Sequence, residues 1–334
     1  MGSKIGSLLI RHRVPLHFFS NKVVAVDAFN TLYQFLSIIR LPSGRPLTGP
    51  DGYTTSHLVG LFYRLVNFLE LRIKPIFVFD GEPPPFKQRA LEERRRIKRE
   101  FEMKYIEALE KGDIAAAFRR AVMTAKVNTR IVTEAKQLLD LMGVPYLDAP
   151  SEAEAQAAWM VKEGIAYTVA SQDYDSLLFG APRLVLNFAV ASKKYYPKRG
   201  LVEELEPELV HLDEILKTHK LTLEQLIDIA LLIGTDYNEG IRGIGPAKAL
   251  KIIKTYGDIK KAYKAYGWKL DPQLLEVKQF YLNPPVRRVY KFEWREVDEK
   301  GVIIFLKERG FSKKRIEKHL KRLKKGKSLT DFMQ

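Results

Sequence analysis

The chain has 334 residues, 46% of them hydrophobic, which is enough for one large domain or two modest domains with a buried core. No apolar run approaches the ~20 residues that a membrane helix needs, and Arg11, His12 and Arg13 interrupt any signal-peptide pattern. The absence of cysteine excludes disulfides and cysteine-ligated zinc and favours an intracellular setting. The formal net charge of +16 predicts a polyanionic partner rather than a membrane.

Three short apolar runs of the sequence each end close to an aspartate. They are residues 22–26 before Asp27, residues 75–79 before Asp80, and residues 167–170 before Asp173. Runs that are apolar on both faces indicate buried parallel strands, and the segments between them have helical spacing. We therefore expect an α/β fold with a mostly parallel central sheet flanked by helices on both faces. The three carboxylates are then expected to converge at the edge where the strands end.

Two acidic pairs lie in the middle of the chain. Glu152 and Glu154 stand at the predicted start of a helix, and Asp173 and Asp175 follow a predicted strand. Close carboxylates repel one another unless protons or hard cations neutralise them, which favours a site for divalent metal ions. A local interpretation is also open, because Ser151 and Glu154 have the spacing of a capping box and aspartates are common in turns.

Residues 83–130 differ in character from the rest of the chain. After three prolines, residues 87–104 contain eight basic and four acidic residues, with too few apolar positions for a buried face. A break at Gly112 precedes a second helix that is expected to reach about residue 130. One interpretation is a solvated helix pair joined by salt bridges. The other is a projecting basic element that contacts phosphates, with Lys87 and Arg94 two helical turns apart on one face.

A glycine-rich segment joins two predicted helices at residues 240–250. Its alternation of apolar residues with glycine indicates a tight hairpin, and Pro246 and Lys248 lie at the start of the second helix. Such a hairpin binds a phosphate backbone without reading sequence, which accounts for the alternation better than a plain turn does. Asp236 supplies a seventh acid just before it. Residues 307–327, with eleven basic and two acidic residues, form a further predicted helical surface for a duplex.

Together these motifs resemble the structure-specific 5′ nucleases, and the similarity to the archaeal flap endonucleases is close. The similar segments are VAVDAFNTLYQFL, TTSHLVGLFYR, KPIFVFDGEPPPFK, LMGVPYLDAPSEAEAQAAWM, SQDYDSLLFGAPRL, LIGTDYNEGIRGIGPAKAL and YLNPPV, which cover nearly the whole chain. The resemblance implies a metal-dependent endonuclease that cuts 5′ flaps at DNA junctions in replication (Okazaki fragment maturation) and repair, with 5′–3′ exonuclease activity. It also implies that residues 83–130 form a helical arch that the 5′ strand threads through.

The resemblance assigns site residues position by position. The family's metal ligands match Asp27, Asp80, Glu152, Glu154, Asp173, Asp175 and Asp236. Lys87 and Arg94 match a basic pair at the foot of the arch that contacts the scissile phosphate. The DNA-contacting positions match Gly2, Tyr33, Arg40, Gly243, Gly245 and Lys248. In a helix–hairpin–helix element, Gly240, Ile241 and Ile244 would offer backbone carbonyls to a K⁺ ion.

The resemblance further implies one nuclease domain at residues 1–320. Its expected parts are an N-terminal part (1–82), the arch (83–130), an internal part (131–239), the helix–hairpin–helix region (223–265) and a basic C-terminal helical part (300–325). The tail at 326–334 resembles a peptide that binds the sliding clamp (PCNA) through Leu329, Phe332 and Met333. Gly326 stands where the family usually has Gln, which weakens that motif. We expect a monomer in the cytoplasm or nucleoid that acts on branched DNA with a 5′ flap.

The chemistry expected of this set is two-metal-ion hydrolysis. Two Mg²⁺ ions, for which Mn²⁺ can substitute, would act on the attacking water and the leaving 3′ oxygen, while Lys87 and Arg94 stabilise transition-state charge. Three alternatives stay open: a sibling 5′ nuclease (a gap endonuclease or junction resolvase), a non-catalytic junction-binding scaffold, and a clamp-associated adaptor. Mg²⁺ dependence separates the nucleases from the other two, and comparison of DNA substrates separates the siblings.

Overall fold

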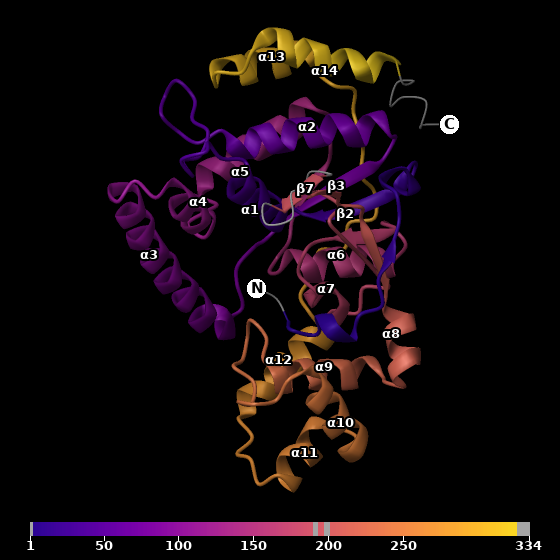
Figure 1. Cartoon of the computed structure of the whole chain (residues 1–334). Coiled ribbons are helices and arrows are strands. Elements are labelled where there is room, and N and C mark those ends of the chain that lie inside the picture. The colour runs from indigo at the N-terminus through magenta and orange to yellow at the C-terminus, as the bar shows by residue number, and fades with distance from the viewer. Residues whose placement is uncertain (1–2, 190–192, 197–200, 326–334) are drawn as a thin grey trace.

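The computed structural model describes residues 3–189, 193–196 and 201–325, and it is built on one seven-stranded sheet (Figure 1). The strand order is β1 (His12–Arg13), β9 (Glu208–His211), β6 (Arg183–Leu186), β5 (Thr168–Ala170), β2 (Val23–Asp27), β3 (Lys74–Phe79) and β4 (Tyr146–Asp148). The strands from β6 to β4 run parallel, whereas β9 and β1 are added antiparallel at one edge. The predicted mostly parallel sheet is confirmed. A separate hairpin pairs β7 (Lys193–Tyr196) with β8 (Leu201–Glu204).

Helices connect and cover these strands. In the N-terminal half they are α1 (Ala28–Ile38), α2 (Ser56–Glu70), α3 (Gln88–Glu110), α4 (Ile114–Val122), α5 (Thr129–Leu141) and α6 (Ala153–Lys162). In the C-terminal half they are α7 (Asp175–Leu178), α8 (Leu212–His219), α9 (Leu223–Ile233), α10 (Pro246–Tyr256), α11 (Ile259–Ala265), α12 (Pro272–Leu282), α13 (Glu299–Glu308) and α14 (Lys313–Lys325). Short 3₁₀ helices occupy Gly6–Leu8, Leu16–Phe19 and Pro85–Lys87. Among the described residues, no helix has the length and apolar character needed to cross a membrane.

The sheet buries side chains on both of its faces. On β2, Val24 and Val26 enter one hydrophobic core and Ala25 enters the other, as the two-residue period of a strand requires. The first core is completed by α1, α2, α5, α13 and α14, and the second by α6, α7, α9 and the helices beyond it. Figure 1 shows α2, α13 and α14 above the sheet and α6, α7 and α9 below it. The prediction of helices on both faces is therefore confirmed.

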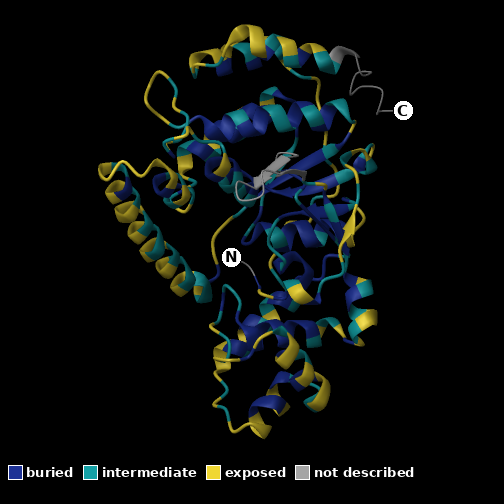
Figure 2. Cartoon of the chain, viewed as in Figure 1, coloured by how far each residue is buried: buried dark blue, intermediate teal, exposed yellow. Residues whose placement is uncertain are grey.

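The pair α3 and α4 projects from the side of the molecule. Figure 1 shows α3 extending away from the sheet, and Figure 2 shows that it is mostly exposed. Ala108 is the one buried residue of α3, and it packs against Ala116 and Ala117 of α4. A helix pair with so little core of its own is a projecting element, as the polar composition of residues 83–130 indicated.

The second helix of this projection is shorter than the sequence predicted. α4 ends at Val122, and residues 123–128 leave the helix before α5 begins at Thr129. The side chain of Asn128 accepts the backbone N–H of Ile131 at 3.0 Å, which caps α5. The expected helix to residue 130 is wrong because this cap starts a new helix inside that range.

The basic C-terminal segment is helical, and it is divided into α13 and α14. Gly310 takes a φ of +85°, a left-handed conformation that ends α13 and separates it from α14. α14 is amphipathic and buries Ile316 and Leu320 against the core that contains α2. Arg322 donates to Glu70 and to Asn67, both at 3.2 Å, which ties α14 to α2.

Candidate metal centre and arch foot

The three aspartates that follow strands converge at the carboxyl edge of the sheet. β5, β2 and β3 are adjacent and parallel, so Asp173, Asp27 and Asp80 leave the sheet next to one another. Asp27 is only 3% exposed. Burial, and then the charges of Asp80 and Asp173, raise its pKa to about 8. Burial also raises the pKa of Asp80, although Lys87 and Arg94 offset part of the effect.

Glu152 and Glu154 join Asp80 at the start of α6. Each of these three residues offers one carboxylate oxygen, and the three oxygens lie within 4.8 Å of one another. Burial raises the pKa of Glu152 to about 7, although the charge of Lys87 opposes the shift. Burial and the charges of Asp27 and Asp80 raise the pKa of Glu154 well above its ordinary value. The acids are therefore close enough to disfavour each other's ionisation.

The alternative interpretation of Ser151 and Glu154 as a capping box is not what the structure shows. The N-cap of α6 is Glu152, and its side chain makes no capping hydrogen bond. Instead Asp80 accepts the N–H of Ala153 at 2.7 Å, so an aspartate from the end of β3 caps the helix. Because this distant carboxylate satisfies the helix terminus, the acidic side chains of the first turn are not engaged in capping.

Asp175 and Asp236 extend the cluster towards the N-terminal segment and α9. Asp175 is the first residue of α7, and burial together with the charges of Asp236 and Asp173 raises its pKa to about 6. The backbone N–H of Ser3 donates to Asp175 at 2.8 Å, which brings the start of the described chain against the carboxylates. Gly2 itself lies outside the described residues.

The seven predicted acids thus form one connected cluster, and their chemistry fits divalent metal ions. Carboxylate oxygens are the ligands that hard cations such as Mg²⁺ prefer. The raised pKa values of Asp27, Glu152 and Asp175 indicate negative charge that the protein leaves partly uncompensated. A bound divalent cation would neutralise that charge and restore ionisation.

Two cationic side chains at the foot of the arch reach this cluster. Lys87 forms an ion pair with Glu152, and Arg94 forms one with Asp236. Both pairs are part-buried, and the surrounding carboxylates raise the pKa of Lys87 despite its burial. Lys87 ends the 3₁₀ turn before α3, and Arg94 lies two helical turns further along the chain. The two side chains therefore project from the same face, which is the face turned towards the acidic cluster.

Comparison with known proteins identifies the family to which this arrangement belongs. Residues 4–101 match the XPG N-terminal domain and residues 143–236 match the XPG I-region. The chain is 50% identical to flap endonuclease 1 of Archaeoglobus fulgidus, over 98% of this chain and 97% of that protein. It is 49% identical to flap endonuclease 1 of Pyrococcus abyssi, over 97% of this chain and 94% of that protein. The chain belongs to the flap endonuclease family.

Two solved structures share the fold. The flap endonuclease-1 of Methanococcus jannaschii superposes with a TM-score of 0.76 at 38% identity, covering 96% of this chain and 98% of that one. The catalytic core of Rad2 in complex with DNA substrate superposes with a TM-score of 0.71 at 24% identity, covering 96% of this chain and 97% of that one. The first likeness supports the family assignment, and the second concerns the fold alone.

Two further predicted residues of this flap endonuclease family member lie on or after α1. The ring of Tyr33 is 5.4 Å from the ammonium of Lys98 on α3, so it faces the arch. Arg40 donates to the carbonyls of Leu36 and Gly44, at 2.8 and 2.9 Å, and thereby braces the loop after α1. Tyr33 therefore lies beside the projecting helix α3, whereas the hydrogen bonds of Arg40 are made to the backbone of neighbouring residues.

The glycine-rich hairpin forms between α9 and α10 as expected. Gly240 and Gly243 have φ values of +72° and +80°, and the N–H of Ile244 donates to the carbonyl of Ile241 at 3.0 Å. Gly245 is the N-cap of α10, with Pro246 in the first turn and Lys248 exposed beside it. Exposed backbone at a helix N-terminus next to a lysine suits a phosphate group. The clamp-binding residues Leu329, Phe332 and Met333 lie outside the described residues.

Three side chains that were not predicted from the sequence lie at this centre, two bonded to the acids and one beside Lys87. Asn30 donates to Asp173 at 3.1 Å, and Ser171 donates to Asp27 at 3.1 Å. The ring of Tyr237 is centred 6.0 Å from the ammonium of Lys87, and burial raises its pKa well above the ordinary value. Their positions within a few residues of the acids are the only signal that the sequence carries for them.

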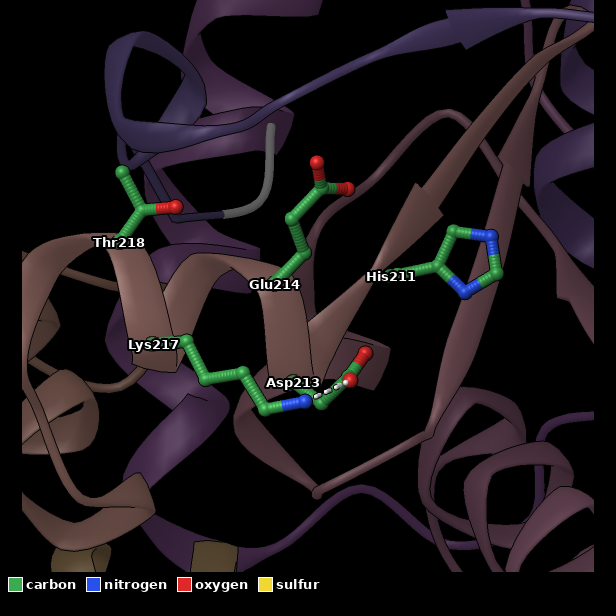
Figure 3. Close-up of a pocket in the computed structure, with 5 residues that line it drawn as sticks. All are labelled: His211, Asp213, Glu214, Lys217 and Thr218. Atoms are coloured by element: carbon green, nitrogen blue, oxygen red, sulfur yellow. Dashed lines mark hydrogen bonds and ion pairs between the residues drawn. The ribbon is translucent and has the colours of Figure 1, made fainter.

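A surface hollow elsewhere on the molecule is not part of this centre. Figure 3 shows it along α8, where its lining includes an ion pair of 2.9 Å between Asp213 and Lys217. The full lining is His211, Asp213, Glu214, Lys217 and Thr218. None of the predicted site residues lines this hollow. The acidic cluster therefore remains the candidate functional centre.

Proposed function

We propose that the chain is a structure-specific 5′ flap endonuclease that hydrolyses a phosphodiester bond at DNA junctions, in replication and repair, with 5′–3′ exonuclease activity. The observation that carries the proposal is the contact between the acidic cluster and the arch foot. Lys87 and Arg94, at the foot of the projecting helix pair, form ion pairs with Glu152 and Asp236, two acids of the cluster. Acids that can bind metal ions beside cations that can bind a phosphate are what a phosphodiesterase needs.

The proposed cofactor is Mg²⁺, two ions per site, with Mn²⁺ as a substitute. Asp80, Glu152, Glu154 and Asp173 would hold one ion, and Asp173, Asp175 and Asp236 would contribute to the other. When bound, the ions supply Lewis-acid activation of the attacking water and stabilisation of the leaving oxygen. Asp27 lies within the same buried cluster and would act on the ions directly or through water.

The cationic side chains supply the protein's own electrostatic contribution. In the structure Lys87 and Arg94 are paired with Glu152 and Asp236. A scissile phosphate would compete with these carboxylates for the two cations and draw its oxygens towards the acidic cluster. The cations then stabilise the extra charge that develops on the phosphate while water attacks phosphorus and the 3′ oxygen leaves. The products are a 5′ phosphate and a 3′ hydroxyl.

The proposed substrate is branched DNA with a 5′ flap. The hairpin at Gly243 and Gly245, with Lys248 on α10, would bind duplex backbone, and a K⁺ ion at Gly240, Ile241 and Ile244 would stabilise it. The exposed basic face of α14 offers a second surface for phosphates. The α3–α4 pair would admit the 5′ strand. We further propose a monomer that binds a sliding clamp through residues 326–334.

The test is cleavage of an end-labelled double-flap duplex with Mg²⁺ and with EDTA. The expected result is Mg²⁺-dependent release of the 5′ flap, abolished in Asp173→Ala while DNA binding persists. Asp213→Ala removes an exposed carboxylate of α8 outside the cluster and serves as the matched control. Tight DNA binding without cleavage would favour a junction-binding scaffold instead. Faster cutting of gap, Y-junction or four-way junction DNA would favour a sibling nuclease.

A further inference from the structure

Asn30 on α1 bonds to two acids of the cluster at once. Its backbone N–H donates to Oδ1 of Asp27 at 2.9 Å, and its side-chain Nδ2 donates to Oδ2 of Asp173 at 3.1 Å. The two acids end neighbouring strands but are far apart in the sequence. A single residue therefore fixes the orientation of one carboxylate relative to the other.

The orientation of the Asn30 amide is itself determined by its neighbours. Its Oδ1 accepts the backbone N–H of Gln172 at 3.2 Å and also accepts the side-chain amide of Gln34. A backbone N–H can only donate, so the atom that it meets must be the oxygen. The Nδ2 group is consequently the one that points at Asp173.

A second side chain reinforces the same pair of acids. Ser171 donates from Oγ to Oδ2 of Asp27 at 3.1 Å, and its Oγ accepts the N–H of Asp173 at 3.2 Å. With the bond from Asn30, both oxygens of Asp27 are held by the protein. Helix capping alone accounts for the backbone bond from Asn30, since Asp27 is the N-cap of α1. It does not account for the side-chain bond to Asp173.

We propose that Asn30 is a positioning residue that pre-orients Asp173 for a divalent cation, an inference that rests on the proposed two-metal function. A carboxylate that rotates freely must lose that freedom when it binds an ion, whereas an oriented carboxylate has already lost it on folding. Groups that hydrogen-bond to metal ligands commonly change metal affinity or activity by 10- to about 100-fold when removed. Gln34 supports Asn30 from the next turn of α1.

The test measures the Mg²⁺ concentration that half-occupies the site, called the midpoint below, by fitting the rise in melting temperature against Mg²⁺ concentration with the full chain without DNA. Asn30→Ala is expected to raise this midpoint about tenfold. Cleavage by the variant should recover at high Mg²⁺, because the liganding acids remain. Ser37→Ala, which removes a buried hydroxyl from the same helix, is the matched control and should leave the midpoint unchanged.

The outcomes separate this inference from the proposed function. No Mg²⁺ response in the wild-type protein, or the same response in Asp173→Ala, would overturn the metal centre and the positioning role together. A normal wild-type response with an unchanged midpoint in Asn30→Ala would overturn the positioning role alone. Should Asn30→Ala fail to fold, Gln34→Met carries the same test: a smaller rise in the midpoint supports the role, and no rise overturns it.

Discussion

At the scale of single residues, the structure shows how the chain tolerates so many buried acids. An isolated buried carboxylate is costly unless hydrogen bonds or opposite charges compensate it. Here backbone N–H groups serve Asp80 and Asp175, and Lys87 and Arg94 pair with two further acids. The compensation is incomplete, as the raised pKa of Asp27 indicates. The remaining charge is what makes the cluster suited to cations.

The role of Lys87 is open to a direct test. Lys87→Ala should lower the single-turnover cleavage rate by about 10²–10³-fold, since it removes a donor to the transition state. DNA affinity should change little, because the many other exposed cations of the chain would remain available to the phosphate backbone. Arg89→Ala is the matched control: Arg89 lies two residues further on and pairs with Glu239, both exposed by at least 70%. Equal loss of rate in the two variants would contradict a specific role for Lys87.

The acids of the cluster could be predicted from the sequence, but the residues that form hydrogen bonds to these acids could not. Apolar runs that end in Asp27 and Asp80 point to one sheet edge, because parallel strands share their direction. The bond from Asn30 to Asp173 depends on which strands become neighbours, and no local spacing encodes that. Local spacing also left a capping box at Ser151 open, whereas the cap of α6 comes from Asp80, a residue outside its own segment.

At the scale of elements, hydrophobic periodicity predicted the parallel strands and most helices. The residues at which helices begin and end depend instead on single capping residues and glycines. α9 begins at Leu223, where the helix–hairpin–helix region was expected to start, because Thr222 forms a capping box with Gln225 there. α4 and α14 differ because Asn128 and Gly310 interrupt patterns that look continuous. The antiparallel strands β1 and β9 were not predicted, since they are short and lie at the sheet edge.

The hairpin before α10 offers a prediction about an element. Gly240 and Gly243 both have positive φ, so alanine at either costs about 1–2 kcal/mol in backbone strain. A Cβ on Gly240 would also lie 2.3 Å from the carbonyl carbon of Ile233, whereas a Cβ on Gly243 meets nothing within 4 Å. Gly240→Ala should therefore lower the free energy of unfolding clearly more than Gly243→Ala, in denaturant titrations. Equal losses would mean that the steric contact is relieved by movement of the hairpin.

At the scale of the whole molecule, the charge is segregated. The acids gather inside, at one edge of the sheet, while the net charge of +16 is carried by exposed surfaces. Figure 1 places α3 at one side, α10 and α11 at one end, and α13 and α14 at the other. A branched DNA with its arms and flap in different directions fits such an arrangement, and binding should weaken steeply with salt.

The pH dependence of stability tests the charge of the whole cluster. The folded pKa values of Asp27, Glu152 and Asp175 are about 8, 7 and 6, above their ordinary values of 3.8, 4.5 and 3.8. A raised folded pKa stabilises the fold at low pH, and this stability is lost as the pH rises through the folded pKa. The melting temperature without metal should therefore fall between pH 5.5 and 8.5, and the rise caused by Mg²⁺ should grow over the same range. Asp175→Asn should flatten the fall between pH 5.5 and 6.5. A metal-free melting temperature that increases with pH would contradict the charge assigned to the cluster.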